Sequence, residues 1–171
     1  MDMNNMLMLD ENTFLRLMEQ SFDGVMFHNY SIDLFDLLHL EGFKKLHMQQ
    51  YQDEGNNLAE LKHYYIHQFN QLPSISSSKN NLWSNPIGAV SEESIPDIVK
   101  NALNTYYSWE SDVLTNLLSW RKESKEKIIF QNKIKDVMLE IERLETLMSI
   151  LEEHDYNYEC ICEVSNYLAN N

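Results

Sequence analysis

The chain has 171 residues, 43% of them hydrophobic, and a formal net charge of −14. This length fits a single domain, and the hydrophobic content excludes a disordered polypeptide. An acidic surface repels the phosphate backbone of nucleic acids, so the composition argues against a nucleic-acid-binding protein. No apolar run approaches the roughly 18–20 residues that a membrane-spanning helix needs, so we also expect no membrane partner.

The two cysteines and the first residues bear on the cellular compartment. Cys160 and Cys162 are separated by one residue, which is a poor spacing for a structural disulfide bond. The segment Met1–Asn12 is acidic and lacks the apolar core of a signal peptide. We therefore expect a reducing, cytoplasmic location.

Long helices are the secondary structure that the composition favours, because the chain has only 4 Gly and 3 Pro residues. The apolar spacing predicts an all-α protein with helices at about 11–29, 41–71, 94–121, 126–153 and 157–169. On the first helix, the apolar residues of one side are Leu15, Met18, Phe22, Val25 and Met26. On the second helix, they are Phe43, Tyr51, Leu58, Leu61 and Tyr65.

The stretch from Ser74 to Ala89 is the one long segment without apolar periodicity. It separates the second and third predicted helices, whereas the other connections are short. An up-down-down-up four-helix bundle needs one such connection, which crosses from one end of the bundle to the other. A coiled coil is a structural alternative. A cytokine-like bundle is excluded, because it needs two long crossovers and a secreted context.

Polar residues interrupt the apolar faces of the four long helices. At 100° per residue, Glu110 lies in the middle of the apolar stripe of the third helix, and Glu54 lies in that of the second. Glu19 lies at one edge of the stripe of the first helix. On the fourth helix the corresponding position is Arg143, which is flanked in angle by Leu139, Leu147 and Ile150. The pattern predicts three glutamates and one arginine directed towards the core.

These inward charges require compensation. Burying an unpaired carboxylate costs several kcal/mol, so buried acids are paired, protonated or bound to metal. Three converging glutamates repel one another, and either metal cations or Arg143 can neutralise them. The alternative is that some of these residues lie at helix edges and reach water.

A second candidate metal motif is the E-x-x-H of Glu60 and His63. His63 follows Glu54 by nine residues, which places it about 180° from Glu54 on the helix. We therefore expect Glu60 and His63 on the outer surface. The same argument places His28, nine residues after Glu19, on the outside.

Two segments of the second predicted helix carry a family resemblance. Leu40–Lys45 looks like the start of the second helix of a ferritin, and Gln52–Asn57 occupies the place of the glutamate-rich E-x-x-H segment of that family. Glu19 precedes Glu54 by 54 − 19 = 35 residues. This is the separation between the first two metal-binding glutamates of the ferritin family.

The second half of the chain resembles the same family. Ala102–Leu118 is similar to the third ferritin helix, with Glu110 at the position of the metal-bridging glutamate. Glu142–Leu144 aligns with an E-Q-hydrophobic segment of the fourth helix. The short last helix matches the fifth helix, which in the family lines a symmetry axis of a hollow shell of 24 subunits.

The resemblance implies a fold, a cofactor and a site. The fold is a single ferritin-like domain over residues 1–171, a four-helix bundle with one long crossover between the second and third helices and a short fifth helix. The cofactor is iron. The resemblance places the catalytic ferroxidase residues at Glu19, Glu54 and Glu110, and a further metal-ligand position at Asn57.

The sequence also departs from the family pattern. Asn57 replaces the histidine of E-x-x-H, Arg143 replaces a glutamine, and Met26 stands where a tyrosine is often found. An asparagine binds iron more weakly than imidazole, and an arginine binds no metal and stays cationic. The acidic inner-surface positions of the family correspond to Gln49, Gln52, Asp53 and Asn56, of which one is an acid.

We therefore expect an iron-storage subunit with weak or absent ferroxidase activity, which forms a homo-oligomer, up to a 24-subunit shell, or co-assembles with an active ferritin subunit. A single-metal site on Glu19, Glu54 and Glu110 is an open alternative. The alternative function is a non-catalytic, structural ferritin-like protein without iron, in which Arg143 neutralises the buried glutamates. A different diiron oxygenase would need two E-x-x-H motifs on facing helices, and the sequence has none in register.

Overall fold

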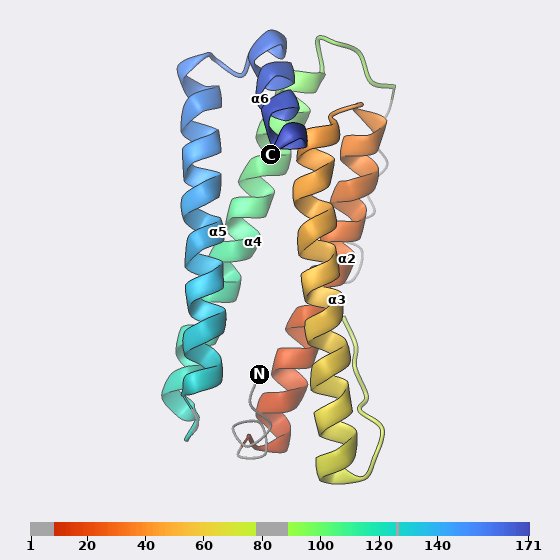
Figure 1. Cartoon of the computed structure of the whole chain (residues 1–171), viewed down its shortest axis with the longest axis vertical. Coiled ribbons are helices and arrows are strands. Elements are labelled where there is room, and N and C mark those ends of the chain that lie inside the picture. The colour runs from red at the N-terminus through yellow and green to blue at the C-terminus, as the bar shows by residue number, and fades with distance from the viewer. Residues whose placement is uncertain (1–8, 78–88, 126) are drawn as a thin grey trace.

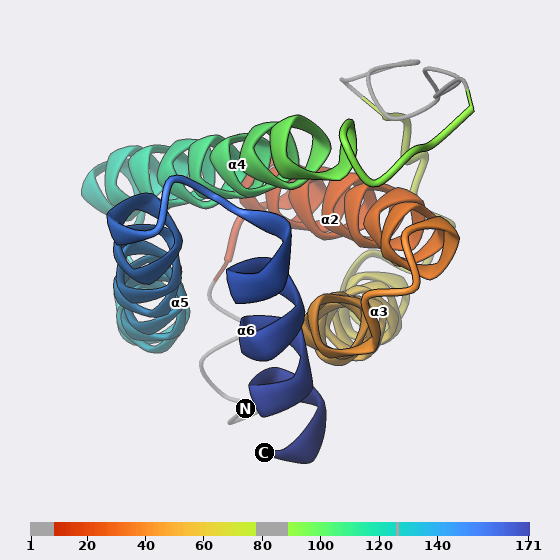
Figure 2. The same ribbon diagram turned by 90° about the horizontal axis from the view of Figure 1, so that it is seen from above.

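A computed structural model describes residues 9–77, 89–125 and 127–171, and within these residues the chain is all-helical, as predicted. The helices are α2 (Glu11–Leu37), α3 (Glu41–Phe69), α4 (Ile95–Glu123), α5 (Ile128–Glu153) and α6 (Tyr158–Asn170). The four long helices lie side by side as a four-helix bundle, and the short α6 covers one end (Figures 1 and 2). Among the described residues, none of the helices combines the length and the apolar character that a membrane crossing requires.

The helices pair into two antiparallel hairpins. Helix α2 packs extensively along α3, and α4 packs along α5, whereas contacts between the two hairpins are sparse. Helices α3 and α4 run in the same direction, so Phe69 and Ile95 lie at opposite ends of the bundle (Figure 1). Helix α6 packs mainly against α3. A side chain on Gly42 would collide with the backbone of Ser165, so this glycine permits the close approach of α6.

One predicted helix end was wrong. Four helices begin and end within two residues of their predicted bounds, but the first was predicted to end at Asn29 and continues to Leu37. The polar sequence after Asn29 does not stop the helix because Ser31, Leu34 and Phe35 continue its buried face. The helix ends where His39 adopts a left-handed conformation, with φ 56°.

The buried face of α2 also differs from the prediction. Of the predicted apolar side, Met18 is buried, but Met26 is 46% exposed. The face that packs against the bundle carries small and polar residues between its large ones. Its members include Phe14, Leu17, Ser21, Gly24, Phe27, His28, Ser31 and Phe35. The prediction that His28 lies outside was therefore wrong, because the face of α2 that packs against α3 runs through Phe27, His28 and Phe35, whose rings contact His47 and Phe43.

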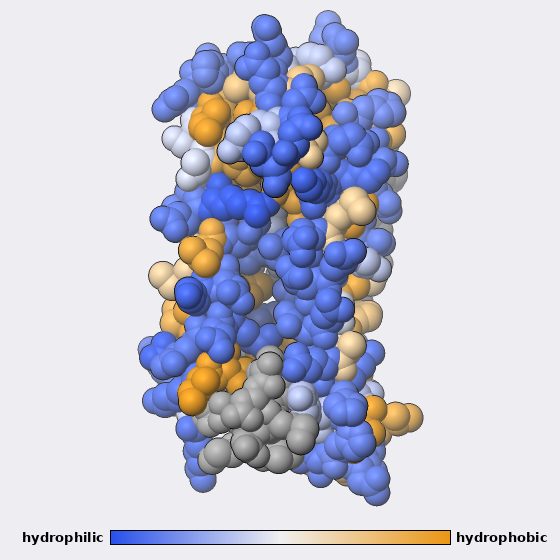
Figure 3. Space-filling model, viewed as in Figure 1, coloured by the Kyte–Doolittle hydropathy of each residue, from blue (hydrophilic) through white to orange (hydrophobic). Residues whose placement is uncertain are grey.

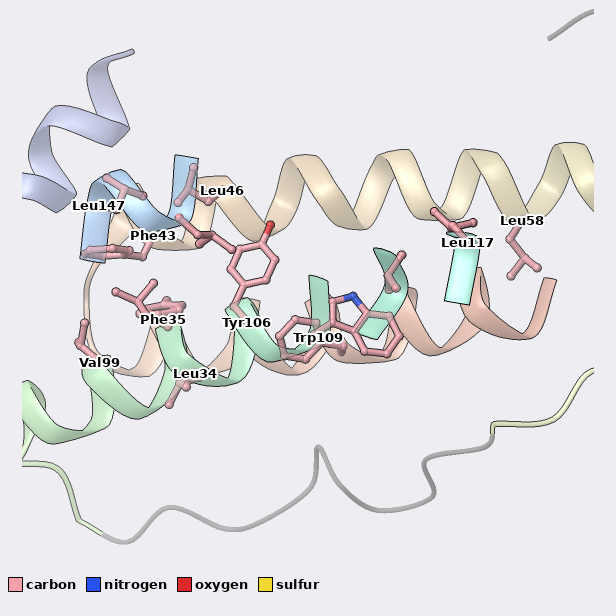
Figure 4. Packing of buried hydrophobic residues seen from close by; sticks show 14 of the residues in the cluster. Leu34, Phe35, Phe43, Leu46, Leu58, Val99, Tyr106, Trp109, Leu117 and Leu147 are labelled. Atoms are coloured by element: carbon pink, nitrogen blue, oxygen red, sulfur yellow. The ribbon is translucent and has the colours of Figure 1, made fainter. Parts of the chain in front are cut away.

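The other helices follow their apolar patterns more closely. On α4, the apolar stripe around Glu110 is buried, and its buried residues are Leu103, Tyr106, Val113 and Leu117. On α3, the predicted face is confirmed except at Tyr51, which is exposed. Tyr106 reaches from α4 towards α3 within a cluster of large apolar side chains (Figure 4).

Candidate functional site

A polar cavity of about 560 Å³ lies between the two hairpins, and we call it the central cavity. All four long helices contribute to its lining, which includes Ser21, Glu54, Glu110, Lys133, Glu140 and Arg143. The molecular surface is mostly hydrophilic and is hollowed between α5 and α3 (Figure 3). Polar and charged side chains line this part of the bundle, together with the apolar Leu17, Val113 and Leu117.

Three glutamates line this cavity, Glu54, Glu110 and Glu140, together with Asp53 and Asp136. Glu110 is 5% exposed and Glu140 is 8% exposed, while Glu54 is half-buried. Burial raises the pKa of Glu110 well above its usual value, and the negative charges of Glu140 and Glu54 raise it further. Glu110 therefore holds its proton more strongly than an ordinary glutamate does.

Two cationic side chains share the cavity with these acids. Burial lowers the pKa of Lys133, and the nearby charges of Glu54, Glu60 and Asp136 oppose this effect. In turn, burial raises the pKa of Glu54, and the positive charge of Lys133 is the largest effect that lowers it. The chain thus supplies its own positive charge beside Glu54.

The second cation, Arg143, lies at the edge of α5. Its Nη1 atom lies 3.6 Å from Oε2 of Glu140, and its side chain is 41% exposed. The prediction that the fourth helix directs an arginine into the core is therefore wrong in its detail. The buried residue of that turn is Glu140, and Arg143 reaches it from the cavity rim.

Glu140 also receives a buried hydrogen bond. The hydroxyl group of Tyr106 donates to Oε1 of Glu140 over 2.7 Å. Burial raises the pKa of Tyr106 well above its usual value, and the charges of Glu140 and Glu110 add to the shift. Tyr106 therefore stays neutral and acts as a donor, so that Glu140 is compensated on both oxygens.

Two buried histidines lie next to Tyr106. The Nδ1 atoms of His28 and His47 are 2.9 Å apart, and the ring of His47 lies 4.6 Å from that of Tyr106. One Nδ1 must donate and the other must accept, so two neutral rings in this pair hold different tautomers. Burial lowers the pKa of His28 to about 3 and lowers that of His47 well below its usual value. Among the described residues, Nε2 of His28 has no hydrogen-bond partner.

The structure brings together some of the predicted site residues and separates one. Glu54, Asn57, Glu110 and Arg143 all line the central cavity. Glu19 lines a different pocket of about 110 Å³, beside Trp109 and Asp112. The buried face of α2 passes through Ser21 and Gly24, so Glu19 is turned away from the other glutamates.

Sequence reasoning missed Glu140 and Lys133. Glu140 lies on the same side of α5 as Leu144, Leu147 and Leu151, all of which are buried. This spacing in the sequence indicates that Glu140 is buried as well. Lys133 is seven residues before Glu140, on the same side of the helix. The prediction treated Leu139 and Ile150 as core residues, although both are exposed, and it therefore directed Arg143 inward.

The residues present do not fit a diiron centre. Within residues 9–77, 89–125 and 127–171, no three His, Cys, Asp or Glu side chains come together as a metal-binding group. Glu19 faces another pocket, Asn57 offers only an amide, and Lys133 and Arg143 bring positive charge to the acids that would bind a metal. The outward placement of His63 was predicted, and this residue is exposed.

Comparison with known proteins adds no family assignment. The sequence matches no protein-family model, and no curated protein matches it significantly.

The histidine pair predicts a characteristic response to pH. Because the folded-state pKa values of His28 and His47 lie below the unfolded value near 6.5, only the unfolded chain takes up protons as the pH falls below 6.5. Each histidine should then lower the free energy of unfolding by about 1.4 kcal/mol per pH unit. In an NMR titration, the ring signals of both residues should keep the chemical shifts of neutral imidazole down to the pH of unfolding. Their His→Gln variants would assign the signals, and titration of both rings near pH 6.5 would refute the buried neutral pair.

The bond between Tyr106 and Glu140 can be tested against an adjacent control. Tyr106→Phe removes a buried donor from a carboxylate and should lower the free energy of unfolding by about 1–3 kcal/mol. Tyr107, the next residue, donates a hydrogen bond to Glu145 over 3.0 Å at an exposed position. Tyr107→Phe should therefore change the free energy of unfolding by less than about 0.5 kcal/mol. Urea unfolding of both variants provides the measurement. Equal losses would mean that the buried carboxyl does not depend on Tyr106.

Proposed function

We propose that this chain is a ferritin-like subunit that contributes to the wall of an oligomeric iron-storage assembly and does not itself oxidise iron. The family resemblance of the sequence supports this proposal. So do the two antiparallel hairpins, the position of Phe69 and Ile95 at opposite ends of the bundle, and the carboxyl groups in the bundle centre.

The observation that carries the loss of oxidation is the pair of cations in the central cavity. Lys133 lies among Glu54, Glu60 and Asp136, and Arg143 pairs with Glu140. A ferrous ion that entered this cavity would be repelled by the positive charges of Lys133 and Arg143, and it would find Asn57 in place of an imidazole ligand. We infer that the cationic side chains take over the role of charge compensation that metal ions have in an active subunit.

The proposal has consequences for assembly. Iron loading would depend on slow chemistry at the inner surface of a homo-oligomer, up to a 24-subunit shell, or on co-assembly with an active ferritin subunit. A cytoplasmic location is part of the same proposal, since Cys160 and Cys162 are free thiols.

A second candidate is a structural ferritin-like protein that no longer handles iron. It is favoured by the lack of a three-ligand group within the described residues. The two candidates differ in iron retention. An iron-storage subunit that is incubated with ferrous iron in air should retain a mineral after desalting, and a purely structural protein should retain none.

The proposal predicts that the native protein oxidises ferrous iron in air no faster than its Glu110→Gln variant, with both at the rate of buffer alone. The substitution keeps the shape of a side chain that is central to any carboxylate metal site in this cavity. Absorbance of the ferric product after mixing provides the measurement, with an active ferritin as the positive control. Faster oxidation by the native chain, lost on substitution, would show a working ferroxidase and overturn the proposal.

A further inference from the structure

An apolar groove of about 630 Å³ lies on the α4–α5 hairpin, lined by residues of these two helices alone, and we call it the α4–α5 groove. Its floor includes Leu114 and Ile134, and its rim includes Met138 and Leu139. Met138 is 56% exposed and Leu139 is 54% exposed. Apolar side chains of this size that gather around an open groove are typical of a protein-binding surface.

The charges around this groove are divided between its two ends. Arg121 and Lys135 lie towards the end where α4 and α5 connect, and Glu142 and Glu145 lie towards the other end. The groove is therefore positive at one end, apolar in the middle and negative at the other end. A ligand that matches it needs the opposite order of charges around an apolar centre.

A second copy of the same groove has this order when it is turned end to end. On α5, the residues Gln131, Lys135, Met138, Glu142 and Glu145 recur at intervals of three and four, so they form one stripe along the helix. With a two-fold axis beside Met138, Lys135 of each copy lies opposite Glu142 of the other, because both are three or four residues from the axis. The apolar centres then meet each other.

The charge distribution along the chain favours this occupant over an unrelated surface. Between residues 121 and 135, leaving out Lys133 of the central cavity, the chain has five basic residues (Arg121, Lys122, Lys125, Lys127 and Lys135) and two acidic ones (Glu123 and Glu126), a net charge of 5 − 2 = +3. The remainder of the chain carries −14 − 3 = −17. A second copy offers an acidic surface to this basic end, whereas parallel association would bring the two basic ends together.

We propose that the α4–α5 groove binds the same groove of a second copy in an antiparallel, isologous two-fold arrangement. This interface needs no iron chemistry, and it provides one of the contacts that the proposed oligomeric assembly requires. In a two-fold interface each residue near the axis acts twice, so a single substitution there has a doubled effect.

Analytical ultracentrifugation of the full chain tests the interface. The native protein should sediment as a dimer or a larger even-numbered assembly. Met138→Glu should weaken the dimer at least about tenfold, because it brings two carboxylates together at the axis. Met48→Glu is the matched control, since Met48 is a similarly exposed methionine on α3, away from the groove, and its assembly should equal that of the native chain. Both substitutions are at exposed positions, and circular dichroism would verify folding.

A charge exchange identifies the partner as a second copy. Lys135→Glu and Glu142→Lys should each weaken association, and the double variant should restore it, because the pair is re-formed across the axis with its signs exchanged. A monomeric native chain, equal effects of Met138→Glu and Met48→Glu, or a double variant no better than the single ones would overturn the proposal. Ferrous-iron oxidation by a native dimer would overturn the proposed function and leave this interface standing.

Discussion

Three carboxyl groups, those of Glu54, Glu110 and Glu140, lie in the middle of this bundle, where an unpaired buried charge costs several kcal/mol. Each is accommodated differently. Glu54 lies near Lys133, and Glu140 accepts a hydrogen bond from Tyr106 and pairs with Arg143. The pKa of Glu110 is raised by burial and by the charges of Glu140 and Glu54, which favours its protonated form. The rest of the structure follows from this constraint, since the hairpins stay far enough apart to keep these groups in contact with a polar cavity.

Packing around the cavity depends on small residues as much as on large ones. A Cβ atom on Gly24 would stand 3.1 Å from the side chain of Glu54, so the glycine leaves the space that this side chain occupies. Ser21 and Ser31 are buried on the same face of α2. The tight α2–α3 hairpin therefore positions Glu54 at the cavity without a large apolar residue beneath it.

The sequence predicted the features that depend on periodicity within one helix. Four of the helices and the inward direction of Glu54 and Glu110 follow from apolar spacing, because these stripes on α3 and α4 are continuous. The buried face of α2 could not be obtained in this way, since glycine, serine and histidine residues are buried on it while Met26 is exposed. Glu19 and His28 were misplaced for that reason. On α5, Leu139 and Ile150 have the spacing of core residues but are exposed. The prediction therefore placed Arg143 in the core and missed the buried Glu140.

The central claim is that cations of the chain, rather than bound metal, compensate the central carboxyl groups. A double-mutant cycle in chelator-treated buffer tests it most directly, with Lys133→Met, Glu54→Gln and the double variant compared with the native chain by urea unfolding. The account predicts a favourable coupling between the two side chains of about 1 kcal/mol or more. Additive effects, together with an increase in stability when ferrous iron is added without oxygen, would show that metal supplies the compensating charge and would contradict it.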